Sequence, residues 1–131
     1  MKPLCVMSVP HTGTFFTYYM LPGKHAKSDI EAGHKYFAHV TDPTHVRFLN
    51  SECEIIVPLR RYDRVQASWI RRKLDVSRLA SAWEYALNIT GAFFLQIDAN
   101  DRDQQLTRLS ARLGCHLTTD WTLANHLQAS V

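Results

Sequence analysis

Long apolar runs are missing from this sequence of 131 residues. No stretch reaches the roughly 18 consecutive apolar residues of a membrane-spanning helix, so we expect no membrane partner. Cysteine is scarce too, with three widely spaced residues and no Cys-x-x-Cys pair. This odd number argues against the disulfide framework of a secreted protein and predicts reduced thiols in the cytoplasm. The apolar start runs directly into a turn, which predicts a buried strand rather than a signal peptide.

A strong net charge is also absent. The formal net charge is +3, which is too small to indicate a nucleic-acid partner. Lys and Arg are instead concentrated between Arg60 and Lys73, which predicts a local field that attracts anions or, more simply, a solvated basic helix face. No repeat, low-complexity tract or linker interrupts the chain, and 46% of its residues are hydrophobic. We therefore expect residues 1–131 to form a single globular domain.

Short apolar runs alternate with helical patterns along the chain. Strands are predicted at residues 4–9, 36–40, 54–59 and 92–97, and helices at residues 14–21, 63–73, 76–89 and 102–113. The runs "EIIVPL" and "AFFLQI" are typical of strands buried on both faces. Alternation of this kind predicts an α/β domain, a three-layer sandwich with a mainly parallel sheet of about four to five strands.

The predicted helices carry end signals. Asp63 with Gln66, and Asp101 with Gln104, have the spacing of N-terminal capping boxes. Gly114 follows the last helical pattern, where a C-terminal cap belongs. Ligands of parallel α/β sheets bind outside the carboxyl ends of the strands, so the residues that follow each strand are the candidates for a functional site.

The first such segment is "PHTGTFF", between a predicted strand and a predicted helix. Backbone N–H groups at residues 12–15 would face an anion there, Gly13 allows a close backbone approach, and the hydroxyls of Thr12 and Thr14 add donors. A Walker A loop, G-x-x-x-x-G-K-[ST], is absent. On this segment alone, an anion-binding loop and an ordinary strand–helix connection are equally acceptable interpretations.

The second segment is "LRRYDRVQASW", in which Ser68 follows Arg60 by eight residues. An Arg at the end of a strand and a hydroxyl from the next helix can hold one phosphate from two sides. Together the two segments resemble the sulfotransferase family, with its P-[KR]-[ST]-G-[ST]-[ST]-[WFL] loop and its R-x7-S element. The resemblance spans residues 4–117, includes "FFLQIDANDRDQQLTRLSARLGCHL" near the end, and implies the P-loop-like fold of that family.

The resemblance implies that the cosubstrate is 3′-phosphoadenosine 5′-phosphosulfate (PAPS), which leaves as 3′-phosphoadenosine 5′-phosphate (PAP). The loop would hold the 5′-phosphosulfate, whereas Arg60 and Ser68 would hold the 3′-phosphate. The family uses no metal. The cofactor-binding residues expected on this basis are Thr12, Gly13, Thr14, Phe15, Phe16, Arg60 and Ser68. Phe16 is equally well interpreted as the first core residue of its helix.

His39 matches the catalytic histidine of the family and would act as the general base that takes the proton of the acceptor. A strand-end histidine bonded to a loop is the alternative, and His34 and His45 lie a few residues away. His11 is a departure from the family, because Lys or Arg usually stands there and stabilises the oxygen that the sulfuryl group leaves. A histidine supplies that charge only when it is protonated, so His11 is a catalytic candidate that puts the rate in doubt.

Length is the second departure, because family members commonly have at least twice as many residues. The resemblance therefore implies an unusually short member, and residues 118–131 contain no Arg-Lys-Gly element of the kind that closes over the 3′-phosphate. An open site suits a large acceptor, such as a protein or carbohydrate chain, or completion by a second subunit in a homo-oligomer. A hydroxyl or an amine would accept the sulfuryl group.

Two other functions compete with an active sulfotransferase. One is a catalytically inactive nucleotide- or partner-binding module derived from the same fold, which His11 favours. The other is a phosphotransferase of the P-loop class, which the missing Gly-Lys-Ser/Thr argues against because nothing obvious would bind magnesium. The general lack of a Walker B-like acidic residue at the strand ends also favours a metal-free mechanism, with Asp98, after the last predicted strand, as the exception.

Overall fold

The computed structural model of the chain describes residues 1–117. Its centre is a four-stranded sheet in the order β2-β1-β3-β4. The strands are β1 (Leu4–Ser8), β2 (Lys35–His39), β3 (Glu54–Leu59) and β4 (Phe93–Gln96), and every pair of neighbours is parallel. The predicted α/β class and parallel sheet are therefore confirmed.

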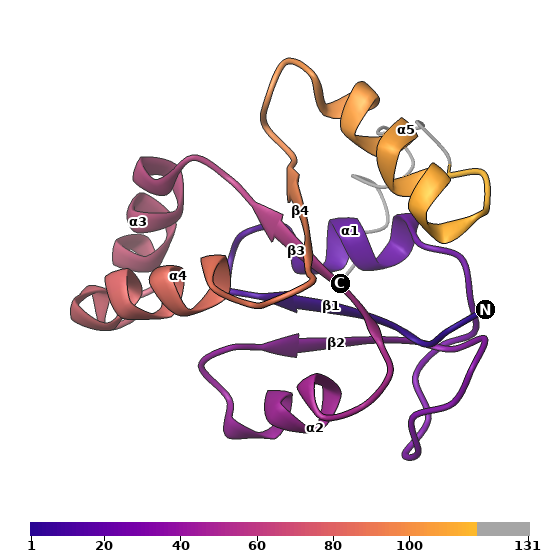
Figure 1. The fold of residues 1–131 in the computed structure, drawn as a ribbon. Helices are drawn as coiled ribbons and strands as arrows, with labels where there is room; N and C mark the ends of the chain where they lie inside the picture. Colours follow the sequence, from indigo (N-terminus) through magenta and orange to yellow (C-terminus); the bar gives the residue numbers. More distant parts are fainter. Residues whose placement is uncertain (118–131) are drawn as a thin grey trace.

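Helices cover both faces of this sheet (Figure 1). Helix α1 (Thr14–Met20) and helix α5 (Arg102–Leu113) pack on one face. The opposite face carries the short helix α2 (Val46–Leu49) together with α3 (Tyr62–Arg71) and α4 (Leu79–Leu87). The result is three layers. Among the described helices, none is long and apolar enough to cross a membrane.

The two faces of β1 supply the centre of two separate cores. Cys5 and Met7 point toward α2, α3 and α4, whereas Leu4 and Val6 point toward α1 and α5, and all four are fully buried. This alternation follows from the two-residue period of a strand. Because helices cover both faces of β1, its consecutive residues are all buried. Strands β1 and β3 lie in the middle of the described sheet.

Strand β4 corrects one expectation. The run "AFFLQI" was expected to be buried on both faces, but β4 lies at the end of the described sheet and Phe94 is 37% exposed. Only Leu95 is fully buried in this strand. Strand β3, by contrast, is buried along all but its first residue, as expected. Apolar composition alone does not distinguish an edge strand from a central one, since both can be rich in aromatic residues.

The helix ends give a mixed result. Gly114 ends α5 in the left-handed conformation with φ 69°, as predicted. Neither predicted capping box forms: Asp63 accepts a hydrogen bond from the Arg61 guanidinium at 2.9 Å, and Asp101 accepts one from the side chain of Gln105 at 2.7 Å. Helix α2 was not predicted, because four residues are too few to show a helical period. Residues 22–33 form a loop.

The carboxyl ends of the strands lie at one edge of the sheet, because all neighbours are parallel. At this edge Ser8, the last residue of β1, is in register with His39, the last residue of β2. Arg60 follows β3 directly. The loop between β1 and α1 runs over the same edge. The fold thus brings together segments that are far apart in the sequence.

Candidate functional site

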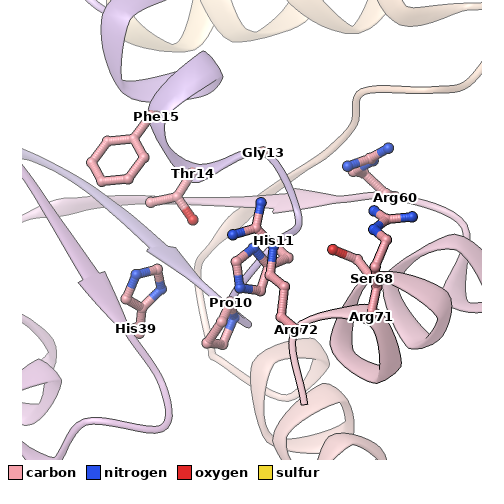
Figure 2. Close-up of a pocket in the computed structure, with 10 residues that line it drawn as sticks. All are labelled: Pro10, His11, Gly13, Thr14, Phe15, His39, Arg60, Ser68, Arg71 and Arg72. Carbon is pink, nitrogen blue, oxygen red and sulfur yellow. The ribbon is translucent and has the colours of Figure 1, made fainter. Parts of the chain in front are cut away.

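A pocket of about 210 Å³ lies at this edge of the sheet (Figure 2). Four segments contribute to it: the loop after β1, the end of β2, the residue after β3 and one face of α3. Its lining consists of Pro10, His11, Gly13, Thr14, Phe15, His39, Arg60, Ser68, Arg71 and Arg72. Seven of the nine residues predicted from the sequence to form a site are among them, and they come from all four segments.

The loop holds its shape through unusual backbone angles and one long-range hydrogen bond. His11 and Gly13 both have positive φ values, 70° and 95°. A Cβ atom on Gly13 would lie 2.3 Å from Cδ1 of Ile97, so the position suits glycine for steric reasons as well. The indole N–H of Trp69, on α3, donates to the Pro10 carbonyl at 2.8 Å. The loop is therefore fastened to α3.

A hydroxyl network lies under the loop. Ser8 Oγ is hydrogen-bonded to Thr14 Oγ1, and it lies 3.4 Å from Nδ1 of His39. Ser8 and Thr14 are both buried. Because Nδ1 is engaged with Ser8, the other ring nitrogen of His39 is the one that remains for a ligand. Figure 2 shows the His39 ring on the β2 side of the pocket, opposite the arginines.

The opposite wall of the pocket is strongly basic. Arg60, Arg71 and Arg72 line it, and no Asp or Glu belongs to the lining. Within residues 1–117, no ion pair forms between any of these three guanidinium groups and a carboxylate. Ser68 is buried, and its hydroxyl faces this wall (Figure 2). Three uncompensated cations beside a hydroxyl donor make a site for an anion with more than one charge.

Both histidines of the pocket have lowered pKa values in the free protein. Burial lowers the pKa of His11, and electrostatic interactions with Arg72, His39, Arg60 and Arg71 lower it further. Burial also lowers the pKa of His39, although the carboxylate of Asp42 and a hydrogen bond to Ser8 partly offset this effect. Both imidazoles are therefore neutral at pH 7. His39 can accept a proton, whereas His11 adds no fixed charge to the site.

Two of the predicted site residues do not line the pocket. Thr12 is fully buried, and its hydroxyl donates to the Val9 carbonyl at 2.7 Å, so it stabilises the turn instead of facing a ligand. Phe16 is 5% exposed and packs in the core between the sheet and α1 and α5. Phe16 is therefore a core residue of its helix, which was the alternative interpretation of the sequence. Phe15 takes the place at the pocket and contacts Phe37 edge-on at a centroid distance of 4.9 Å.

The competing histidines lie elsewhere. The ring of His45 is buried between the Asp42 carbonyl and the hydroxyl of Tyr85, each at 2.7 Å. His34 is buried beside the Ala32 carbonyl. Neither residue lines the pocket. Of the three histidines considered for the role of base, His39 is the one that the fold brings to the loop.

Three contributors to the site were not predicted from the sequence. Arg71 and Arg72 were interpreted mainly as a solvated helix face, although they follow Ser68 by three and four residues and so share its side of the helix. This spacing in the sequence is the feature that could have indicated a role for Arg71 and Arg72 in the site. Ser8 was not considered, and its only signal is a polar side chain at the end of an otherwise apolar strand.

Asp98 has a structural partner. Its carboxylate accepts hydrogen bonds from the backbone N–H of Arg61 at 2.8 Å and from the Gln96 side chain at 2.7 Å. Burial would raise the pKa of Asp98, but these hydrogen bonds outweigh it and the pKa lies below its ordinary value. Asp98 therefore connects the end of β4 to the start of α3. It does not line the pocket.

Residues 118–131, in which the sequence shows no Arg-Lys-Gly element to close over a 3′-phosphate, lie outside the described residues. Within residues 1–117 there is no group of three or more His, Cys, Asp or Glu side chains that could hold a metal ion. Comparisons of the chain with protein-family models, with curated proteins and with solved structures found no match.

Proposed function

We propose that this protein is a sulfotransferase that binds PAPS in the pocket and transfers the sulfuryl group to a hydroxyl or amine. One observation carries the proposal: Arg60 and Ser68 line the same pocket as the Pro10–Phe15 loop and His39. These are the segments that resemble the family, and the parallel sheet brings them together at one edge. The strand order and the place of the loop between β1 and α1 are compatible with a sulfotransferase topology.

The composition of the pocket supports a polyanionic ligand. Its volume of about 210 Å³ is below the roughly 300–1,000 Å³ of pockets that enclose a whole small molecule. It suits the charged groups of a nucleotide better than the complete molecule. Arg60 and Ser68 would hold the 3′-phosphate, and Gly13 and Thr14 would lie against the 5′-phosphosulfate. An open cleft of this kind favours a large acceptor, such as a protein or carbohydrate chain.

The proposed reaction is an in-line transfer. The acceptor oxygen or nitrogen attacks the sulfur, its new bond to sulfur forms, and the bond between sulfur and the bridging phosphate oxygen breaks. The electron pair of that bond stays with PAP. The proton of the acceptor passes to the free ring nitrogen of His39, which is neutral at pH 7 because burial lowers its pKa. Ser8 holds the other nitrogen and fixes the ring.

The first test is calorimetric titration with PAP, and with ADP as the ligand that lacks the 3′-phosphate. We expect PAP to bind and ADP to bind much more weakly. Arg60→Ala and Ser68→Ala should each remove this preference. The loss of the charged contact in Arg60→Ala should lower PAP affinity about ten- to a hundredfold. Arg64→Ala is the matched control, because it removes an equal charge from α3 without touching the pocket. Equal affinity for both nucleotides would refute the proposal.

A catalytically inactive nucleotide-binding module is the second candidate. It is favoured by the lowered pKa of His11, which leaves the loop without a fixed charge. Transfer of labelled sulfate from PAPS to a panel of hydroxyl and amine acceptors separates the two functions. For an enzyme we expect transfer that His39→Ala abolishes while PAP affinity is unchanged. PAP binding without transfer, and without any effect of His39→Ala, identifies the binding module.

A further inference from the structure

The end of α3 determines where the two unpredicted arginines point. Lys73 has a positive φ of 58°, its N–H donates to the Ile70 carbonyl at 3.0 Å, and the N–H of Leu74 donates to the Trp69 carbonyl at 2.9 Å. This pair of bonds is a Schellman motif, here with lysine where glycine is usual. The helix therefore ends sharply after Arg72. The motif holds the backbone of Arg72 in one orientation.

The same end of α3 is fastened to the loop. Trp69 is 3% exposed, and its indole N–H donates to the Pro10 carbonyl. Arg72 follows Trp69 by three residues, so the two side chains leave the helix on one side. Figure 2 shows Arg72 reaching from the end of α3 to the imidazole of His11, below the turn at Gly13. Arg60 and Ser68 lie at the other side of the pocket in this view.

The loop itself brings little positive charge to this position. Residues 10–15 include no Lys or Arg, and α1 has seven residues, which is fewer than two turns. Among the charged groups that act on His11, Arg72 has the largest effect, ahead of His39, Arg60 and Arg71. No carboxylate within residues 1–117 forms an ion pair with Arg72. The fixed charge at the loop end of the pocket therefore comes from α3.

We infer that Arg72 is the fixed cation of the anion subsite at the loop, next to His11. The other subsite is formed by Arg60 and Ser68. Under the proposed function, on which this assignment of groups rests, Arg72 binds the 5′-phosphosulfate and Arg60 binds the 3′-phosphate. Arg72 then faces the bridging oxygen that becomes negative when the sulfur–oxygen bond breaks. It compensates from the helix for the missing cation at position 11.

The test uses three ligands that carry different anionic groups. PAP carries both groups, adenosine 3′-phosphate lacks the 5′ group, and inorganic pyrophosphate has no nucleoside. We expect Arg72→Ala to weaken PAP and pyrophosphate binding about ten- to a hundredfold and to leave adenosine 3′-phosphate within about twofold. Arg64→Ala, an equal loss of charge on α3 at a residue that does not line the pocket, should leave all three affinities nearly unchanged. His11→Lys combined with Arg72→Ala should recover most of the PAP affinity.

Two results would overturn the inference. One is an equal loss of affinity for PAP and for adenosine 3′-phosphate in Arg72→Ala, because Arg72 would then attract any anion in the pocket and would not contact the 5′ group. The other is pyrophosphate binding that is absent, or that Arg72→Ala does not weaken. The proposed function fails separately: if the protein binds pyrophosphate through Arg72 but binds neither nucleotide, the loop subsite stands and the PAPS assignment falls.

Discussion

The hydroxyl of Ser8 lies 3.4 Å from Nδ1 of His39, across two neighbouring parallel strands whose last residues are in register. The same hydroxyl is bonded to Thr14, at the start of α1. One buried serine therefore connects the loop of the pocket with its only histidine from the sheet. This contact engages Nδ1 of His39 and leaves Nε2 as the ring nitrogen available to a ligand.

The first prediction concerns the carboxylate next to His39. Asp42 partly offsets the effect of burial on the pKa of His39, so Asp42→Asn should lower that pKa further below 6.5. Asparagine is as good an N-cap as aspartate, so the hydrogen bond from the backbone N–H of Thr44 is kept. The pKa is measured by NMR titration of the histidine ring. An unchanged or higher value in the variant would show that Asp42 does not act on His39.

The second prediction is a loss of stability in mild acid. The pKa values of His11 and His39 are lower in the folded protein than the 6.5 of the unfolded chain. The unfolded chain therefore binds more protons below pH 6.5, and the free energy of unfolding falls as the pH drops from 6.5 toward the folded pKa values. The contribution of Asp98, whose pKa is lowered from 3.8, is lost only at more acidic pH.

The measurement for this prediction is the melting temperature at pH 7.5, 6.5 and 5.5. The His11→Gln/His39→Gln double variant is the control, because it lacks both groups and should show a flatter profile between these values. If wild type and double variant lose the same number of degrees, protonation of these two histidines does not destabilise the fold.

The third prediction separates two costs at Gly13. Gly13→Ala places a Cβ atom 2.3 Å from Cδ1 of Ile97 and forces alanine into a φ of 95°. Gly33→Ala imposes a similar backbone cost at a φ of 80° but meets nothing within 4 Å. We expect each to lower the free energy of unfolding by about 1–2 kcal/mol through the backbone, and Gly13→Ala to lose more. Denaturant unfolding measures both, and equal losses would mean that Ile97 moves aside without cost.

The fourth prediction concerns the bond that fastens α3 to the loop. Trp69→Phe keeps most of the apolar packing but removes the indole N–H that donates to the Pro10 carbonyl. We expect the free energy of unfolding to fall by about 1 kcal/mol, since a partly buried carbonyl loses its partner. PAP affinity should fall too, because Arg72 and the loop lose their fixed spacing. Trp83→Phe is the control, because Trp83 is only partly buried and lies outside the pocket. A PAP affinity that Trp69→Phe leaves unchanged would contradict this role.

Local patterns determined the elements of this protein. Residues 54–59 and 102–113 form the predicted strand and helix with the predicted bounds, because apolar composition and helical period are properties of neighbouring residues. The convergence of Arg60, His39 and the loop at one edge also follows from local structure, once parallel strands are expected. The position of β4 at the edge of the described sheet does not follow from local structure, because it depends on how the strands pair in the folded protein.

The basic wall of the pocket was decided by tertiary structure. The sequence shows that Arg71 and Arg72 share a helix face with Ser68, but a solvated face has the same pattern. What turns that face toward the loop is the hydrogen bond between Trp69 and Pro10, 59 positions apart, together with a helix end formed by a lysine in a conformation that usually needs glycine. A contact across that distance leaves no periodic signal, because its energy depends on the packing of the whole sheet.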